Sequence, residues 1–388
     1  MTPSHEPSNL LKSALWGLLG LHIALLFLTL DRFNGLIDSQ GLPLGADFIT
    51  YWAASHLAQF GHPEQAYDAL ALLASELLVA PIKMPHTGWY YPPQFLLVVY
   101  PLAALHYATA YLVFSVTGLL LYLYAFSVMT QRRGILILFI AFPALFLNLL
   151  SGQNGLLTVS IAALSLYFLE RRPLLAGSMM GLLCIKPQLL LLFPVVLIWS
   201  RNWRALSAFT VSSLTFAALA TVALGADVWP AFLHGLSLAK TYLETDIPLS
   251  RMPTVFALSR QAGTSVALAY ALHGLIALTA LATVLTIWSR SRCMEIRGMA
   301  LIAATLLISP YLFDYDLAWH ALPMLWLYQL GSRNGWIAGE RLVLCITWML
   351  LFYVKLVLYV LTGKVILIGA LISLALLWTA YRRAMQSQ

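Results

Sequence analysis

Charged residues are scarce in this chain. Only 10% of its 388 residues are Asp, Glu, Lys or Arg, whereas 61% are hydrophobic. Soluble globular proteins carry roughly 25% charged residues, so this composition predicts an integral membrane protein. The net charge of +7 would suit a nucleic-acid partner. However, the basic residues lie in short clusters between hydrophobic runs, so we expect no nucleic acid.

Cysteine is rare as well. Cys184, Cys293 and Cys345 lie far apart, in or beside hydrophobic runs. This spacing offers neither a disulfide framework nor a set of metal ligands, so we interpret the three residues as small core side chains. The polar N-terminus also lacks the basic start of a signal peptide. We therefore interpret the first hydrophobic run, 12–30, as an uncleaved anchor.

Long hydrophobic runs dominate the rest of the sequence. A helix that crosses about 30 Å of hydrocarbon needs roughly 20 residues. The runs predict an all-α integral membrane protein with about 12 membrane segments (10–12) in a single transmembrane domain, 1–388. Besides the ambiguous segment 173–200, the runs are 12–30, 103–130, 134–150, 154–170, 205–224, 265–289, 298–310, 317–331, 342–361 and 364–381.

The segment 173–200 has two interpretations. It is either one tilted helix or a hairpin of two short helices that turns at Lys186-Pro187, because proline removes a helical hydrogen bond. The positive-inside rule favours the hairpin, since every basic cluster after the first run then lies on the cytoplasmic side. Those clusters are 132–133, 171–172, 201–204, 290–297, 333–341 and 382–383.

This topology predicts a multi-pass protein of the inner (plasma) membrane with both termini in the cytoplasm. It leaves two long connections on the outer face, at about 31–102 and about 225–264. The first contains GADFITYWAASHLAQFGHPEQAYDAL at 45–70, an amphipathic stretch rich in aromatic residues. Such a stretch predicts interfacial helices at the level of the lipid headgroups.

Polar residues from separate parts of the chain converge on the same outer face. A charge at membrane depth is costly, so each one is a candidate functional residue. We therefore expect a reaction or a recognition site on this face. Besides the second outer connection, the polar stretches are the one around Asp47, SGQNG at 151–155, CIKPQ at 184–188 and SPYLFDYDLAWH at 309–320.

Asp47 is the first candidate. Near the start of a helix, its carboxylate would interact favourably with the helix dipole, which is a purely structural interpretation. The alternative is a general base, held at the membrane surface and directed at a lipid-borne substrate. Tyr51, four residues later, is a candidate contact for the donor or the acceptor of a transferred group.

The other candidates also have two interpretations. Lys186 is either a lysine that snorkels to the interface or a point charge for a phosphate. Gln153 and Asn154 are either turn residues or amide donors to a phosphate or a sugar. Arg251 and Arg260, in the second outer connection, are either solvated or in contact with a donor or acceptor.

Asp314 and Asp316 resemble a metal-binding pair of aspartates. Residues two apart do not share a helix face, however, and nothing nearby completes an octahedral set of ligands, so we predict no metal ion. Asp316 and His320 are four apart and would be neighbours on an α-helix. This is either a buried structural pair or a carboxylate that keeps the imidazole cationic beside a phosphate.

In this order, the segments resemble the signatures of glycosyltransferase family 87, part of the GT-C superfamily of membrane transferases. The resemblance covers about residues 40–330. Its motifs are ADFITYWAASHLAQFGHPEQAYD, WYYPPQFLLVVYPLA, the stretch from SGQNGLL to IWSRNWRA, and SPYLFDYDLAWHALP. It implies a GT-C-type multi-span bundle with interfacial helices in the first outer loop. Better-studied mannosyltransferases of the family are rich in histidine after the position of Ser309-Pro310, where this chain has two aspartates and one later histidine.

The resemblance implies a hexosyltransferase that moves mannose from a polyprenyl-phosphate sugar to a lipid or glycan acceptor, with inversion and without a metal or other cofactor. Asp47 matches the family's proposed catalytic base. Lys186, in the matching KPQ segment, would neutralise the phosphate, and Gln153 and Asn154 would position it. The expected partners are the donor, the acceptor and membrane lipids.

Other functions remain open. One is a transferase for another sugar or a phosphosugar, and another is a transporter or flippase for a polyprenyl lipid or glycolipid. Transporters commonly have broken helices in both halves, whereas only the segment around Pro187 is broken here. A non-catalytic lipid-binding membrane subunit is a further alternative.

Overall fold

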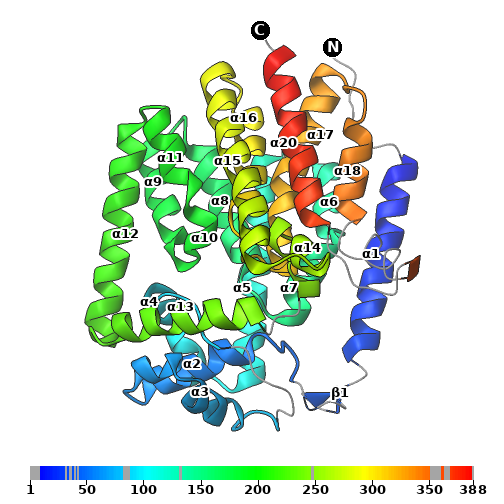
Figure 1. The fold of residues 1–388 in the computed structure, drawn as a ribbon. Coiled ribbons are helices and arrows are strands. Elements are labelled where there is room, and N and C mark those ends of the chain that lie inside the picture. The colour runs from blue at the N-terminus through cyan, green and yellow to red at the C-terminus, as the bar shows by residue number, and fades with distance from the viewer. Residues whose placement is uncertain are drawn as a thin grey trace.

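The protein is an all-helical bundle (Figure 1). The computed structural model describes residues 9–30, 33–34, 37–38, 41, 43–81, 88–130, 133–245, 249–349, 360–361 and 368–386. Within these ranges the only paired strands are β1 (Phe33–Asn34) and β2 (Ile37–Asp38), which form a short antiparallel ribbon. The predicted all-α class is therefore confirmed apart from this ribbon.

Three helices in the described ranges are long and apolar enough to cross a membrane, namely α5 (Tyr107–Met129), α12 (Trp203–Leu224) and α15 (Val266–Arg290). Helices that are hydrophobic on all sides are typical of membrane spans, and large apolar side chains such as Leu214 and Val222 stay exposed on them. Several shorter apolar helices accompany them. The chain is therefore a multi-pass membrane protein.

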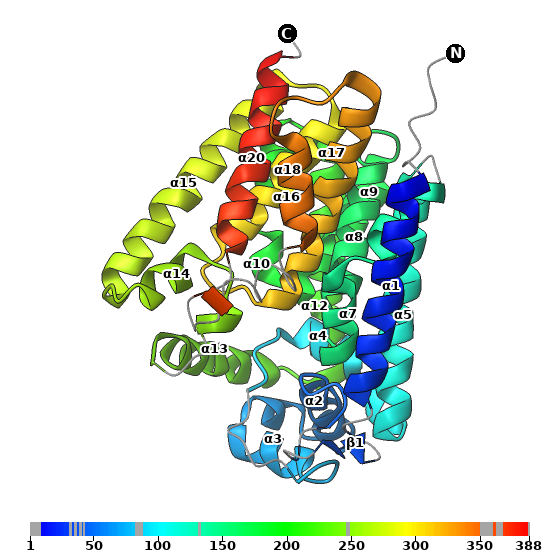
Figure 2. The same ribbon diagram turned by 90° about the vertical axis from the view of Figure 1, so that its right-hand side faces the viewer.

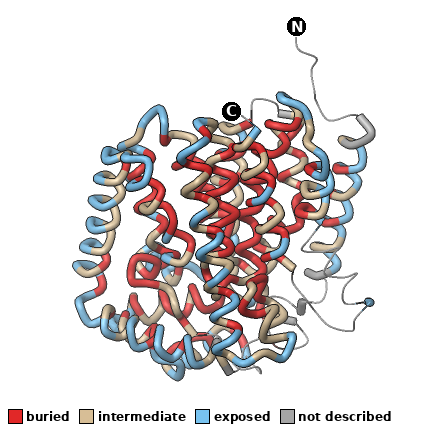
Figure 3. Tube along the Cα trace, turned by 45° about the horizontal axis from the view of Figure 1, so that its top comes forward, coloured by how far each residue is buried: buried red, intermediate tan, exposed pale blue. Residues whose placement is uncertain are grey.

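The remaining bundle surrounds α16 and α17, most of whose residues are buried. Figure 3 shows this buried centre and the more exposed outer helices. The bundle helices are α1 (Asn9–Leu30), α6 (Leu136–Ile140), α7 (Pro143–Ser151), α8 (Gly155–Phe168), α9 (Pro173–Leu182), α10 (Pro187–Leu190), α11 (Leu192–Trp199), α16 (Met294–Ile308), α17 (Ala321–Asn334), α18 (Glu340–Met349) and α20 (Gly369–Gln386), with the 3-10 turns η3 (Arg133–Ile135) and η4 (Leu183–Ile185).

The segment 173–200 is a hairpin. Helices α9 and α12 pack closely and run in the same direction, because Gly177 faces Ala205 while Gly181 faces Ser212. Two helices that start at the same end can be joined only by a chain that crosses the bundle and returns. The turn lies where η4 ends and Pro187 begins α10. The hairpin interpretation of this segment is therefore the right one.

The two long connections predicted to be on one face do lie at one end of the bundle, opposite the end where α1 begins and α20 ends (Figure 1). The connection 31–102 forms short helices across that end, and in Figure 2 α2 and α3 project beyond the bundle. They are α2 (Ile49–Gln59), η1 (Pro63–Tyr67), α3 (Ala69–Glu76), α4 (Pro93–Val99) and η2 (Tyr100–Ala104).

The second connection, 225–264, crosses the same end. It consists of α13 (Val228–Thr245), η5 (Leu249–Arg251) and α14 (Val255–Gln261). The stretch between α16 and α17 forms the 3-10 helix η6 (Asp314–His320). We call this end, with both connections and η6, the loop end.

Two predicted spans differ in detail. The run 134–150 is broken into α6 and α7, because Pro143 begins a new helix after a turn at Ala141. The run 317–331 begins inside η6 instead of in an α-helix. The last two predicted spans are described only in part, since 350–359 and 362–367 lie outside the described residues.

The hairpin has a direct test in a variant whose native cysteines are replaced by serine. Cysteines introduced at Arg172 and Arg204, the starts of α9 and α12, should react with a membrane-impermeant maleimide from the same side. A cysteine at Asp227, at the loop end, should react from the opposite side. Labelling of positions 172 and 204 from opposite sides would contradict the hairpin.

Candidate active site

Two glycine turns position the segments that carry the candidate base and its neighbours. Gly45 has a φ of +71° and Gly152 a φ of +66°, in the left-handed region that favours glycine. A Cβ on Gly45 would lie 2.5 Å from the ring of Tyr111, and one on Gly152 would lie 2.5 Å from the Cβ of Phe48. The two turns therefore pack against shared aromatic side chains, which holds Asp47 in place.

Asp47 is fixed on one side by Gln153. The Gln153 Nε2 group donates to Asp47 Oδ2 at 3.1 Å, while Gln153 Oε1 accepts from the hydroxyls of Tyr51 at 2.5 Å and Tyr91 at 3.2 Å. Burial is the main cause that raises the pKa of Tyr51 and of Tyr91, and it outweighs the opposing effect of the Lys186 charge on Tyr91, so both phenols stay protonated. Two phenolic donors fix the amide orientation, with its NH₂ directed at Asp47.

Arg251 holds Asp47 on the other side. Its Nη2 lies 3.2 Å from Asp47 Oδ2 and 3.3 Å from Asp314 Oδ1. Burial lowers the pKa of Arg251, but the two carboxylates more than offset this effect, so the pKa lies above its usual value. The Arg251 side chain is nevertheless 34% exposed and Asp47 is 18% exposed. Both groups are therefore accessible to a ligand.

Asp47 does not cap α2. That helix begins at Ile49, after Phe48, and its N-cap residue makes no side-chain hydrogen bond. Asp47 Oδ2 bonds instead to Gln153 and Arg251, and Oδ1 has no hydrogen-bond partner among the described residues. Asp47 therefore makes no described capping bond to α2, and its Oδ1 is left to accept a proton.

Lys186 forms a second, buried ion pair. Its Nζ lies 2.5 Å from Asp316 Oδ1 and 3.1 Å from Asn154 Oδ1, and it lies 4.7 Å from the centre of the Tyr315 ring. The side chains of Lys186 and Asp316 are only 2% and 1% exposed. Since the Arg251 guanidinium also lies 6.0 Å from the Tyr315 ring, the two ion pairs are neighbours across one aromatic side chain.

Two sequence candidates lie apart from this cluster. His320 Nε2 is bonded to Ser373 in α20, and Asp316 uses its oxygens for Lys186 and the backbone of Phe313. The expected contact between Asp316 and His320 is absent from the described bonds, because η6 has three residues per turn and residues four apart do not align. Arg260 donates to the carbonyl of Thr264 and has no described bond to the cluster.

Three residues that no sequence pattern places at this site also take part in the cluster. Tyr91 bonds to Gln153, Asp314 pairs with Arg251, and Tyr315 lies beside both cations. Tyr91 lies in the quoted motif WYYPPQ, but a tyrosine among several aromatics carries no distinguishing signal. Asp314 was considered only as a metal ligand. The two aspartates instead pair with different cations, and the described residues contain no group of three potential ligands (His, Cys, Asp, Glu).

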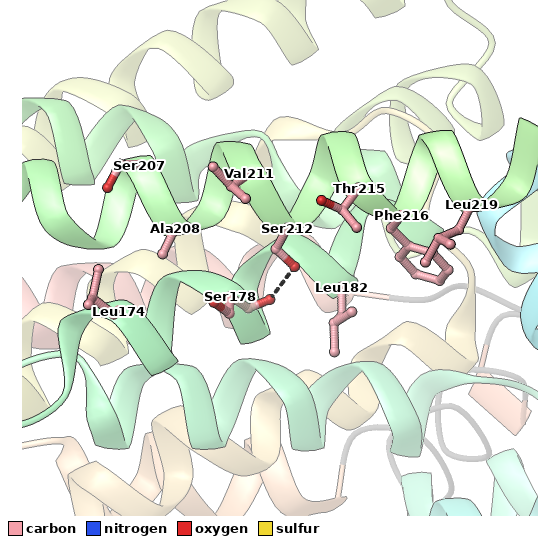
Figure 4. A pocket seen from close by; sticks show the side chains of 10 residues that line it. All are labelled: Leu174, Ser178, Leu182, Ser207, Ala208, Val211, Ser212, Thr215, Phe216 and Leu219. Carbon is pink, nitrogen blue, oxygen red and sulfur yellow. Dashed lines mark hydrogen bonds between the residues drawn. The ribbon is translucent and has the colours of Figure 1, made fainter.

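A groove with a volume of about 660 Å³ lies between α9 and α12 (Figure 4). One end is close to the cluster, because Leu182 precedes Lys186 by four residues and Phe216 packs against the buried group that contains Tyr51. None of the lining residues is a predicted site residue. They are Leu174, Ser178, Leu182, Ser207, Ala208, Val211, Ser212, Thr215, Phe216 and Leu219.

Comparison with known proteins gave one match. The family model described as glycosyltransferase family 87 matches residues 89–310, more than half of the chain. The match includes Tyr91, Gln153, Lys186 and Arg251, whereas Asp47 lies before it. No curated protein and no solved structure matches the chain.

The Lys186–Asp316 pair predicts a strong coupling in stability. Removal of one partner from a buried pair leaves an uncompensated charge and costs about 3–5 kcal/mol. We expect Lys186→Met and Asp316→Leu each to lower the thermal unfolding midpoint of the purified protein by several degrees, and the double variant to recover part of the loss. Additive single effects would show that the two side chains are not coupled.

Proposed function

The chain belongs to glycosyltransferase family 87, and we propose that it transfers a hexose from a polyprenyl-phosphate sugar to a lipid or glycan acceptor at the outer membrane face. Membership of the family makes the protein a glycosyltransferase. We propose the rest: the donor is a polyprenyl-phosphate sugar, the sugar is mannose, and the reaction takes place at the outer face. The observation that carries the proposal is the partly exposed carboxylate of Asp47, which lies beside the guanidinium of Arg251 and has one oxygen without a bond to any described residue.

In this proposal Asp47 is the general base. Its Oδ1 accepts the proton of the acceptor hydroxyl, while Gln153 and Arg251 hold Oδ2 and so fix the direction of the carboxylate. The position of the carboxylate does not depend on the substrate, because Gln153 is itself held by Tyr51 and Tyr91. Gln153 therefore acts as a positioning residue for the base, in place of the phosphate contact predicted for it from the sequence.

We propose Arg251, and not Lys186, as the cation for the donor phosphate. Both described bonds of Arg251 use Nη2, so its other N–H groups remain for phosphate oxygens. Lys186 is buried and already neutralised by Asp316. In this revised assignment Lys186 and Asn154 hold the hairpin turn against η6. Arg251 is the residue that contacts the donor.

The reaction balances with these groups. The acceptor oxygen forms a bond to the anomeric carbon while the bond from that carbon to the phosphate oxygen breaks. The acceptor proton goes to Asp47, and polyprenyl phosphate leaves with the electron pair, stabilised by Arg251. Attack opposite the leaving phosphate inverts the anomeric centre. The mechanism needs no metal, since the leaving group carries one phosphate.

The groove between α9 and α12 supports a lipid-linked donor. It lies along a helix with the length and hydropathy of a membrane span, and its end at Leu182 and Phe216 approaches the ion-paired cluster. A polyprenyl chain in the groove would place its phosphate near Arg251. The serine and threonine side chains on α12 bond mostly to nearby carbonyls, as Ser212 does to Ser178 (Figure 4), which keeps the groove suited to an apolar chain.

The role of Asp47 is tested by Asp47→Asn, with purified protein, synthetic polyprenyl-phosphate mannose and a membrane-lipid extract as acceptor source. General-base catalysis contributes about 10²–10⁴-fold, so we expect transfer to fall by at least 10²-fold while donor binding and thermal stability change little. The matched control Asp227→Asn removes an exposed carboxylate at the same end and should retain activity.

Transfer by Asp47→Asn at more than a tenth of the wild-type rate would rule out this base. Absence of transfer by the wild type from mannose, glucose or arabinose donors, despite measurable donor binding, would favour a lipid transporter or a non-catalytic lipid-binding subunit.

Variants of Arg251 and Arg260, the two arginines of the second connection, test which of them binds the donor phosphate. Arg251→Ala should raise KM for the donor by about tenfold or more, because a charged hydrogen-bond partner is lost, and Arg251→Lys should recover part of the loss. Arg260→Ala, in the same connection but bonded to Thr264, should leave KM for the donor unchanged. Equal effects of the two alanine variants would contradict the assignment of Arg251.

A further inference from the structure

A second polar cluster lies at the loop end, outside the site described above. The hydroxyl of Tyr270, near the start of α15, donates to Glu244 Oε1 at 2.8 Å. It also bonds to the hydroxyl of Tyr311, in the stretch between α16 and η6. Since the single Tyr270 proton goes to Glu244, Tyr311 is the donor in the second bond. Three separate segments therefore supply one hydrogen-bonded chain, which we call the Glu244 cluster.

The Glu244 cluster combines a carboxylate that has no ion pair among the described residues with aromatic rings. Glu244 has no ion pair to any described residue, and its Oε2 has no described hydrogen bond. The ring of Phe256 lies 4.6 Å from that of Tyr270 and 6.2 Å from that of Tyr311. Glu244 and both tyrosines are only partly buried. Phe256 is itself buried, so the cluster presents the carboxylate of Glu244 and the partly exposed phenolic rings of Tyr270 and Tyr311 to a ligand at the protein surface.

Aromatic packing connects this cluster to Asp47. Phe313 packs against the same small hydrophobic core as Tyr270 and Tyr311, and it stacks on Tyr315 with ring centres 5.7 Å apart. Tyr315 in turn lies beside Arg251, the residue that bonds to Asp47. The Glu244 cluster therefore lies on the Arg251 side of Asp47, whereas Tyr51, Tyr91 and the α9–α12 groove lie on the Gln153 side.

We propose that the Glu244 cluster binds the acceptor, and that the acceptor carries a sugar at its reacting end. This inference rests on the proposed function and adds the chemical class of the second substrate. A sugar ring offers adjacent hydroxyls that donate to a carboxylate and C–H faces that pack on aromatic rings. A simple lipid alcohol offers only one hydroxyl and would leave most of these groups unused.

The aromatic contacts through Phe313 and Tyr315 connect the Glu244 cluster to Arg251, which bonds to Asp47. In the proposed reaction the acceptor hydroxyl gives its proton to Asp47, so a sugar bound at the cluster would belong to the substrate that carries this hydroxyl. Glu244, Tyr270 and Tyr311 are then specificity residues for the acceptor.

The first experiment measures binding without turnover. The full-length protein in nanodiscs is mixed with hexyl α-mannoside, hexyl β-glucoside, hexyl β-galactoside or hexanol, and saturation-transfer NMR is recorded against empty nanodiscs. We expect magnetisation to be transferred from the protein to the sugar-ring protons of at least one glycoside. For hexanol, the signal should not exceed that of the empty nanodiscs. Glu244→Gln and Tyr311→Phe should each weaken that binding by about tenfold.

The control is Glu64→Gln, which removes a partly exposed carboxylate from η1 at the same end. It should bind the glycosides like the wild type. Size-exclusion profiles and unfolding midpoints show whether each variant is folded. If Glu244→Gln does not fold, Tyr311→Phe still tests the inference. Absence of any glycoside signal with the wild type, or unchanged binding by both folded cluster variants, would overturn the inference.

The second experiment uses the same glycosides as acceptors for polyprenyl-phosphate mannose. Glu244→Gln should raise KM for the glycoside by about tenfold, with unchanged KM for the donor and unchanged slow release of mannose to water. If Glu244→Gln slowed the release of mannose to water by the same factor, the cluster would act in donor binding or in folding, and the inference would be overturned.

The two proposals fail separately. Glycoside binding that depends on Glu244, without transfer from any donor, would refute the transferase function and leave the carbohydrate site standing. Transfer that depends on Asp47, with KM for the glycoside independent of Glu244 and Tyr311, would refute only the acceptor site.

Discussion

The loop end of this protein depends on the pairing of buried charges. A cation or a carboxylate in an apolar bundle is tolerated only when it is paired and hydrogen-bonded. Here Asp314 and Asp316, on either side of Tyr315, pair with Arg251 and Lys186 respectively. These two pairs join η6 to η5 and to the hairpin turn. Because Arg251 also bonds to Asp47, the same constraint extends to the first long connection, 31–102.

Hydrogen bonds from neutral side chains complete this constraint. The Gln153 Oε1 atom accepts hydrogen bonds from two phenols, and its Nε2 group donates one to Asp47, so the amide has only one favourable orientation. Buried Asn154, the next residue, accepts from Lys186. One short turn after Gly152 thus contacts both the candidate base and the buried ion pair. Such fixed dipoles stabilise developing charge without reorganisation during a reaction.

The shape of the site separates its two sides. Tyr51 and Tyr91 belong to the aromatic group formed by α2, α4 and the part of α12 at the loop end, next to the groove. Tyr270 and Tyr311 belong to the smaller group formed by α14, α15 and the stretch before η6. Asp47 bonds to one member of each side, Gln153 and Arg251.

The sequence alone determined the class of protein and the place of its candidate site. Hydrophobic length is a local property, so the membrane helices follow from composition, and basic clusters on both sides of 173–200 revealed the hairpin. Polar residues in a chain with few charges also indicated which turns converge, and Asp47, Gln153, Asn154 and Lys186 do lie in one cluster. Helix breaks were less predictable, because Pro143 is read only as one apolar residue within a long run.

The tertiary structure alone decided the partner of each charge. Arg251 and Asp47 are 204 residues apart, and Lys186 and Asp316 are 130 apart, so no local pattern links them. The sequence favoured Lys186 for a phosphate, but the fold buries it against Asp316 and leaves Arg251 exposed beside Asp47. It also favoured His320 beside Asp316, which a 3-10 helix prevents. Ion pairs depend on distance in space, and that distance is set only when the helices pack.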